Sequence, residues 1–271
     1  MSLIGVHVSN ILEIQSNIWK KVKLFQIFVS PSTDYQTERY TRIIETIKNR
    51  KIHILVHASY SINIARDWKS SDPMVQQLIT EIRKSHQIGA FAIVVHTGKS
   101  LDIPLSRALN NMYTLLLYVH EETKGTKVQI LIETPAGQGT ETLVKIQDIC
   151  DFMNKFYKHP KKEVVERFGL CVDTCHVFAA GHDLRKVKET DSFFNIIEKT
   201  IGIEKIKACH LNDSKRELGS KIDRHENIGQ GEIGSEPLNR IIKFMKSLEI
   251  PIIFETPSDL IHDDYMLALM Q

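Results

Sequence analysis

The stretch FAIVVH, residues 91–96, is apolar up to its last residue, is rich in isoleucine and valine, and ends on a histidine. A short run of this kind is typical of a strand buried on both faces of a parallel sheet. Seven similar runs occur along the chain, at Leu3–Val8, Leu24–Val29, His53–Ala58, Gln129–Thr134, Gly169–Thr174, Ile206–Leu211 and Pro251–Thr256. The sequence therefore predicts eight such strands.

Helical patterns fill the gaps between these runs. Ser71-Asp72-Pro73 supplies cap-like residues and a first-turn proline, and Gly89 ends the pattern. A second buried helix face is predicted from apolar residues at three- and four-residue steps: Leu143, Ile146, Ile149, Cys150, Met153 and Phe156. Eight strand-helix alternations without a Pro/Gly/Ser-rich linker favour an α/β fold, a (β/α)₈ TIM barrel forming one domain over residues 1–271.

Composition excludes several classes of protein. The 271 residues include 35 Lys+Arg and 33 Asp+Glu, a net charge of +2, and 42% of them are hydrophobic, as in an ordinary globular protein. No apolar run approaches the roughly 20 residues needed to cross a bilayer, and no secretory signal is evident. We expect an intracellular protein, in cytoplasm, nucleus or virus particle, that does not enter a membrane. Its four cysteines are expected to be reduced core thiols.

Polar residues gather where the predicted strands end. In a TIM barrel the carboxyl ends of the strands form the active-site face, so these side chains are expected to meet in one bowl. The loop after the seventh strand adds an acidic residue and a histidine two positions apart. The set contains five histidines and four carboxylates: His57, His96, Glu133, Asp173, His176, His210, Asp223, His225 and Glu255.

Nine such groups, without comparable Lys or Arg, would repel one another unless cations lay among them. In an extended segment Asp223 and His225 face the same side and can share one ion. Mixed histidine and carboxylate ligands suit Zn²⁺, Mn²⁺ or Fe²⁺, and nine ligands exceed the needs of one ion. We expect a cluster of two or three metals at the C-terminal ends of the strands, which suits in-line phosphoester hydrolysis.

The motifs around these residues resemble the endonuclease IV family of apurinic/apyrimidinic endonucleases, nearly end to end. They are IGVHVS, VHASY, HTG, ETPAGQG, CVDTCHVFAAG, HLNDSK, DRHENIGQGEIG and the ET that contains Glu255. The resemblance implies a DNA-repair enzyme with three zinc ions, which cuts duplex DNA on the 5′ side of an abasic site. It would leave a 3′-hydroxyl and a 5′-deoxyribose phosphate, and would trim blocked 3′ ends.

Carried over residue by residue, the resemblance distributes the nine ligands over three ions. The three sets are His57, His96 and Glu133; Glu133, Asp173, His210 and Glu255; and His176, Asp223 and His225. Glu133 would bridge two ions and so take part directly in catalysis. Manganese or iron could replace zinc at some positions.

The resemblance also points to DNA contacts at the rim of the bowl, at Tyr60, Arg39, Gln138 and Asn212. Two residues depart from the family pattern. Thr97 replaces a proline that commonly follows the histidine equivalent to His96, and Ser61 replaces an aliphatic residue beside Tyr60. The second change predicts a weaker apolar wedge between DNA bases. We expect a monomer acting on abasic or 3′-blocked duplex DNA.

Two other functions fit parts of this pattern. A sugar isomerase or epimerase on a related barrel also gathers His, Asp and Glu around a divalent metal, but would have no evident use for the Asp223-Arg224-His225 segment. A protein that binds damaged DNA without cutting it is the second alternative. Its retention of all nine ligand types would then be unexplained.

Overall fold

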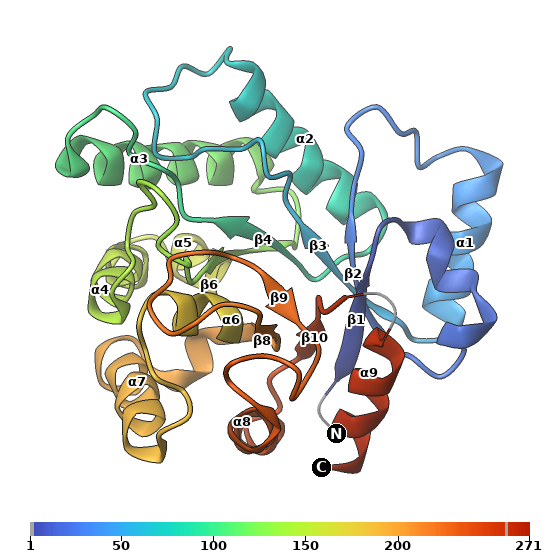
Figure 1. Cartoon of the computed structure of the whole chain (residues 1–271). Coiled ribbons are helices and arrows are strands. Elements are labelled where there is room, and N and C mark those ends of the chain that lie inside the picture. The colour runs from blue at the N-terminus through green and yellow to red at the C-terminus, as the bar shows by residue number, and fades with distance from the viewer. Residues whose placement is uncertain (1–2, 258–259) are drawn as a thin grey trace.

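Eight parallel strands form a closed barrel in the computed structural model, which describes residues 3–257 and 260–271 (Figure 1). The strands follow one another around the barrel in chain order, and the first closes against the last. Their bounds are β1 Ile4–Val8, β2 Leu24–Phe28, β3 His53–His57, β4 Ala92–His96, β5 Gln129–Glu133, β6 Phe168–Asp173, β7 Ile206–His210 and β10 Ile252–Phe254. The predicted TIM barrel is confirmed.

Helices surround the barrel and cover the outer faces of its strands (Figure 1). The α-helices are α1 Glu38–Asn49, α2 Pro73–Gln87, α3 Leu105–Thr123, α4 Ile146–Tyr157, α5 Lys162–Arg167, α6 Thr174–Ala179, α7 Val187–Thr200, α8 Ser235–Ser247 and α9 Ile261–Met270. Short 3₁₀ turns occur at η1 Ile11–Gln15, η2 Asn17–Trp19 and η3 Ile203–Lys205. Within the described ranges no helix is both long and apolar enough to cross a membrane.

The predicted elements agree with the structure except at their ends. All eight predicted strands are present, and α2 begins at Pro73 with Asp72 as its N-cap. The prediction was wrong for Leu143, which lies outside α4. Its backbone has a φ of +61°, a left-handed conformation that a helix cannot contain. The residue is nevertheless buried, so its apolar character reflects core packing rather than helical periodicity.

Two apolar layers account for the barrel. The larger packs the helices against the outside of the strands, and all four cysteines are buried free thiols, as expected. The smaller layer fills the barrel interior with residues Leu24, Leu55, Ala92, Val94, Leu131, Cys171, Ala208 and Ile253. Because side chains alternate along a strand, the next inward position is two residues later. On each strand that contributes to this layer, the last interior apolar residue is followed two residues later by a polar one. That polar residue lies within the strand or just past its end.

One short antiparallel pair lies outside the barrel. It consists of β8, Asp213–Ser214, and β9, His225–Glu226, and Figure 1 shows it beside α6 and β10. Asp213 pairs with Glu226, and Ser214 pairs with His225. The segment that carries the predicted ligands Asp223 and His225 is thus joined to the chain that leaves β7.

A buried histidine lies on the outside of the barrel. His120, near the end of α3, is 3% exposed, and neither ring nitrogen has a hydrogen-bond partner among the described residues. Burial and the nearby Arg167 guanidinium lower its pKa. The folded protein therefore holds His120 neutral.

We expect His120 to make the folded state less stable in mild acid. Since its pKa is lower in the folded than in the unfolded chain, stability should fall as pH drops below about 6.5, the ordinary histidine value. A tenfold difference in proton affinity between the two states corresponds to about 1.4 kcal/mol of unfolding free energy. Thermal unfolding of wild type and His120→Leu from pH 8 to pH 5 tests this. The variant should lose less stability; parallel curves would contradict the assignment.

Candidate metal centre

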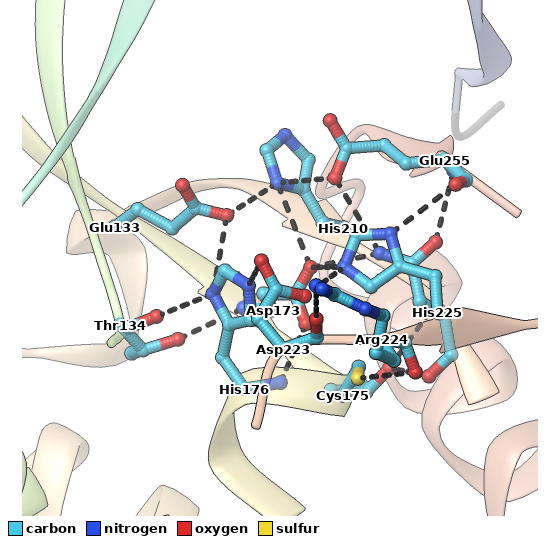
Figure 2. A network of polar contacts seen from close by, with 12 residues as sticks. Glu133, Thr134, Asp173, Cys175, His176, His210, Asp223, Arg224, His225 and Glu255 are labelled. Atoms are coloured by element: carbon cyan, nitrogen blue, oxygen red, sulfur yellow. Dashed lines mark hydrogen bonds and ion pairs between the residues drawn. The ribbon is translucent and has the colours of Figure 1, made fainter. Parts of the chain in front are cut away.

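The inward layer at the carboxyl ends of the strands brings six predicted ligands together. Each lies two residues after a member of the barrel-interior layer, so the alternation of the strands directs it into the same space: His57, His96, Glu133, Asp173, His210 and Glu255. His176 enters from α6, Asp223 from the loop before β9, and His225 from β9 itself. The structure thus brings all nine predicted residues into one cluster, most of which Figure 2 shows.

Glu133 contacts imidazoles from several strands, and Figure 2 shows its contacts with His176 and His210. Its side chain is 1% exposed. One oxygen, Oε1, is 2.7 Å from His210 Nδ1. The other, Oε2, is 3.5 Å from His57 Nε2 and 3.4 Å from His96 Nε2. A single carboxylate therefore faces two separate groups of imidazoles.

Three groups have ligand atoms that lie mutually within 4.8 Å, close enough to surround one ion. These groups are His57, His96 and Glu133; Glu133, Asp173, His210 and Glu255; and His176, Asp223 and His225. They coincide with the three sets implied by the family resemblance. Two further groups include a thiol, from Cys171 or Cys175.

Hydrogen bonds on the far side of the imidazoles orient them toward the cluster. Nδ1 of His57 donates to Ala58 O at 2.8 Å, and Nδ1 of His176 donates to Thr134 O at 2.9 Å. Nδ1 of His225 donates to the backbone oxygen of Glu255 at 3.2 Å. A neutral ring protonated at Nδ1 presents an unprotonated Nε2 on its other side. Three rings thus offer lone pairs to the centre.

Several of the inward atoms are buried and lack a well-formed hydrogen bond among the described residues: Nε2 of His96, His176 and His225, and Oε2 of Glu133. Carboxylate oxygens lie close to these nitrogens, at 3.2 Å from Asp223 to His176 and to His225 and at 3.4 Å from Glu133 to His96. Buried nitrogens and carboxylate oxygens that converge without hydrogen bonds are unfavourable unless a proton or a cation lies between them. Nitrogen and carboxylate donors suit Zn²⁺, Mn²⁺ or Fe²⁺. The residues present therefore fit divalent metal ions.

Without a cation, the cluster retains protons instead. Although burial opposes it, Asp173 and Asp223 hold the pKa of His176 well above its ordinary value. In the same way, against burial, neighbouring carboxylates raise the pKa of His225 to about 9. Despite its own burial, Glu133 has a pKa well below the usual range because His96 and His210 lie beside it. Imidazolium protons thus provide positive charge that metal ions would otherwise supply.

Another carboxylate, Asp213, orders the turn that follows β9, the strand that carries the predicted ligand His225. It is fully buried and accepts hydrogen bonds from the backbone N–H groups of Ser214, Gly229, Gly231, Ile233 and Gly234, at 2.8 to 3.4 Å. Most of these donors lie in Gly229-Gln-Gly-Glu-Ile-Gly234, a G-x-G-x-x-G pattern immediately before α8. Such loops often bind phosphate. Here the carboxylate of the same chain occupies the backbone donors.

The residues predicted to contact DNA differ in placement. Tyr60 is 69% exposed, and its ring centroid lies 5.2 Å from that of His57 and 5.5 Å from that of His96. Exposed Gln138 lines a cavity of about 200 Å³ together with Tyr60, His96 and Asp223. Both therefore lie at the mouth of the centre.

Arg39 and Asn212 do not lie there. Arg39 is exposed near the start of α1 and lines a different groove, with Gln15 and Arg42. Asn212 was expected at the rim, but it is fully buried. Its amide nitrogen donates to Asp173 Oδ2 at 2.7 Å, and its Oδ1 accepts from the backbone N–H of Glu255 at 2.9 Å. The structure thus makes Asn212 a support beneath two predicted ligands.

The departures from the family pattern leave the cluster intact. Thr97 is 5% exposed, and His96 still lies in the first ligand group. Ser61 is exposed, and its hydroxyl lies 3.0 Å from that of Ser59. The position beside Tyr60 is therefore polar, as the sequence indicates.

Sequence reasoning missed Gln26. It is fully buried on β2, and its amide contacts His7, His210 and Glu255. A signal was present, because Gln26 lies two residues after the interior residue Leu24, just as His57 follows Leu55. A glutamine was passed over because it is not an ordinary metal ligand.

Comparisons with known proteins agree with this fold. A family model described as a xylose isomerase-like TIM barrel matches residues 21–268. A probable endonuclease 4 of Mycoplasma mobile is 39% identical over 223 residues, which cover 82% of this chain and 75% of that protein. Endonuclease IV from Thermus thermophilus has the same fold, with a TM-score of 0.79 at 22% identity over 99% of both chains. A D-tagatose 3-epimerase-like protein also shares the fold, with a TM-score of 0.74 at 17% identity over 100% of this chain and 95% of that one.

We expect metal uptake to release protons. At pH 7 the metal-free protein holds a proton on His225, whose pKa is raised to about 9, whereas a metal ligand must be unprotonated. Zinc affinity should therefore rise with pH between 6 and 9. Titration calorimetry at pH 7, in buffers of different ionisation enthalpy, should show release of about one to three protons per chain. An apparent enthalpy that does not depend on the buffer would contradict this.

We also expect Asp213→Ala to loosen the loop over residues 227–234. The change leaves several backbone N–H groups without their charged acceptor and should destabilise the protein by about 2–3 kcal/mol. Denaturant unfolding, limited proteolysis and metal content measure the effect. Asp191→Asn, an exposed change on α7, is the control. Equal protease resistance in both variants would refute this role of Asp213.

Proposed function

The chain belongs to the endonuclease IV family within the xylose isomerase-like TIM barrels, and we propose that it cleaves duplex DNA at abasic sites. As a member it is a hydrolase of the nuclease type. The proposed cut lies on the 5′ side of the abasic site and leaves a 3′-hydroxyl and a 5′-deoxyribose phosphate. We include in the proposal removal of blocking groups from 3′ ends, because this also hydrolyses a phosphoester at a 3′-oxygen.

The observation that carries the proposal is the third ligand group. His176, Asp223 and His225 lie beside the two groups that share Glu133. One or two ions suffice to polarise a sugar carbonyl, whereas in-line displacement at phosphorus requires stabilisation of both attacking and leaving oxygens. A third group beside a shared pair supports phosphodiester hydrolysis over sugar isomerisation.

We propose that all nine clustered residues act as metal ligands, and that the ions are three zincs. Bound divalent ions would supply an activated water and neutralise negative charge on the phosphate and its leaving oxygen. The chain's own contribution would be to place these ions relative to one another. Glu133 directs one oxygen toward His57 and His96 and the other toward His210, so its position sets the separation of the first two groups.

Hydrogen bonds make this arrangement rigid before substrate arrives. Asp173 Oδ1 accepts from the backbone N–H of His176 at 2.8 Å, and Asn212 holds its other oxygen. His176 is anchored in turn to Thr134 O. Pre-oriented ligands of this kind reduce the reorganisation needed during reaction.

Tyr60 is proposed as a DNA contact at the mouth of the centre. Its ring is largely exposed and packs beside His57 and Phe28. Desolvation of the phenol and the nearby Glu255 carboxylate raise its pKa, so the hydroxyl stays protonated at neutral pH. The side chain can therefore stack on a sugar or base and donate a hydrogen bond. We propose Gln138 as a second contact, across the same cavity.

The rest of the proposal concerns the protein as a whole. We propose that residues 1–271 act as one TIM-barrel domain, that the enzyme is a monomer, and that it works inside a cell or virus particle. Arg39 is retained as a proposed phosphate contact at the periphery, in a groove that also contains Arg42 and its ion-pair partner Glu38. None of these residues lies in the metal cluster.

The decisive experiment uses an end-labelled duplex with one tetrahydrofuran abasic analogue. We expect a single cut immediately 5′ to the analogue, abolished by a chelator and restored by zinc. Tetrahydrofuran resists β-elimination, so such a cut requires hydrolysis. Glu133→Gln should reduce cleavage by at least about 10³-fold, because it removes the shared carboxylate charge.

An undamaged duplex is the substrate control, and an exposed substitution such as Asp191→Asn is the protein control. No cleavage by metal-loaded wild type would reject the proposed function. Turnover of a ketose or aldose by the same preparation would instead favour the sugar isomerase or epimerase alternative. Tight abasic-DNA binding without cleavage would favour the non-catalytic alternative.

A further inference from the structure

The buried glutamine on β2 contacts two predicted ligands that come from the neighbouring strands β7 and β10, on the other side of β1. Gln26 Oε1 lies 2.7 Å from His210 Nε2. Gln26 Nε2 lies 2.5 Å from Glu255 Oε1 and 2.8 Å from His7 Nδ1. The side chain has no exposed surface. One amide thus makes three polar contacts in the centre.

The neighbours of the amide decide its orientation. Glu255 Oε1 is a carboxylate acceptor, so the group that faces it must be the N–H₂ end of the amide. The reverse orientation would place two acceptor oxygens 2.5 Å apart. The amide carbonyl therefore points at His210, and a carbonyl can only accept.

This orientation determines which nitrogen of His210 is available to a metal ion. Nε2 donates to Gln26 Oε1 and keeps its proton, so Nδ1 is the nitrogen that can bind an ion. That nitrogen lies 2.7 Å from Glu133 Oε1 and 3.2 Å from Glu255 Oε2. His210 therefore offers Nδ1 to the second ligand group, whereas His57, His176 and His225 offer Nε2.

The same amide restrains Glu255. Its N–H₂ group holds Oε1, so the other oxygen, Oε2, is directed toward His210 Nδ1. Nδ1 of His7 accepts a hydrogen bond from the other N–H of the Gln26 amide, and this contact helps to hold the amide in place. Both predicted ligands of this pair are thus oriented by one uncharged side chain.

We propose that Gln26 is a positioning residue that selects the Nδ1-coordinating form of His210 and orients Glu255 for the second ion. The inference rests on the proposed function, since it concerns the metal centre proposed there. Partners behind a metal ligand typically change metal affinity by 10–100-fold when removed. Both ligands that Gln26 contacts belong to the second group, so the ions of the other two groups should be affected less.

The test compares Gln26→Met, Gln26→Glu and the control Gln129→Met. Methionine keeps the length of the side chain but cannot orient either partner. Gln129 lies on β5, and its amide donates to Glu166 O, away from the centre, so its loss should not reach the ligands. Metal content per chain is measured after dialysis against a graded chelator. Two-bond ¹H–¹⁵N spectra of the zinc-loaded proteins report which ring nitrogen of His210 carries a proton.

We expect Gln26→Met to lose one ion per chain at a chelator activity about 10–100-fold lower than wild type does, and to show mixed His210 tautomers. Gln129→Met should match wild type in both measurements. Gln26→Glu keeps an acceptor for His210 and should keep the Nε2-protonated form. It lacks the two N–H donors that hold Glu255 and His7.

Wild-type metal retention and a single His210 tautomer in Gln26→Met would overturn the proposal. If that variant does not fold, Gln26→Glu decides: mixed His210 tautomers there would also overturn it. Neither measurement involves DNA. A failure of abasic-site cleavage would therefore reject the proposed function. The metal-retention and tautomer measurements would still decide the role of Gln26.

Discussion

The alternation of side chains along parallel strands is the constraint on which this molecule depends. It places Leu55, Leu131 and their equivalents inside the barrel and puts His57 and Glu133 one step higher in the same space. A shift of one residue in any strand would turn its ligand outward, into the apolar layer beneath the helices. The fold and the centre therefore specify each other, because the same register that closes the barrel also gathers the imidazoles and carboxylates.

Burial of so many ionisable groups is tolerable only because oppositely charged or hydrogen-bonding groups lie beside them. Carboxylates hold protons on His176 and His225, and backbone oxygens or an amide fix the outer nitrogen of four rings. Nε2 of His96 and Oε2 of Glu133 nevertheless lack a hydrogen-bond partner in the described part of the chain. This imbalance distinguishes a binding centre from an ordinary buried polar network, whose members satisfy one another.

The sequence predicts the strands and the nine clustered residues because both depend on local patterns. A strand needs only its apolar run, and a ligand needs only to follow that run at the proper end. Long-range partners leave no such trace. Asn212 looked like a rim residue but is buried under Asp173, and Leu143 fitted a helical period but adopts a left-handed conformation. Gln26 shares the inward position of the ligands, yet its importance depends on contacts with residues that lie 184 and 229 positions away.

The carboxylate of Asp213 has a consequence for how substrate would be received. The glycine-rich turn before α8 resembles a phosphate cradle, but its backbone donors already hold an anion of the same chain. An incoming nucleic acid gains nothing from that turn and has no need to order it. The turn loses its conformational entropy once, during folding, rather than each time substrate binds. The proposed recognition would therefore fall to the exposed mouth around Tyr60, while the turn over residues 229–234 serves as scaffold.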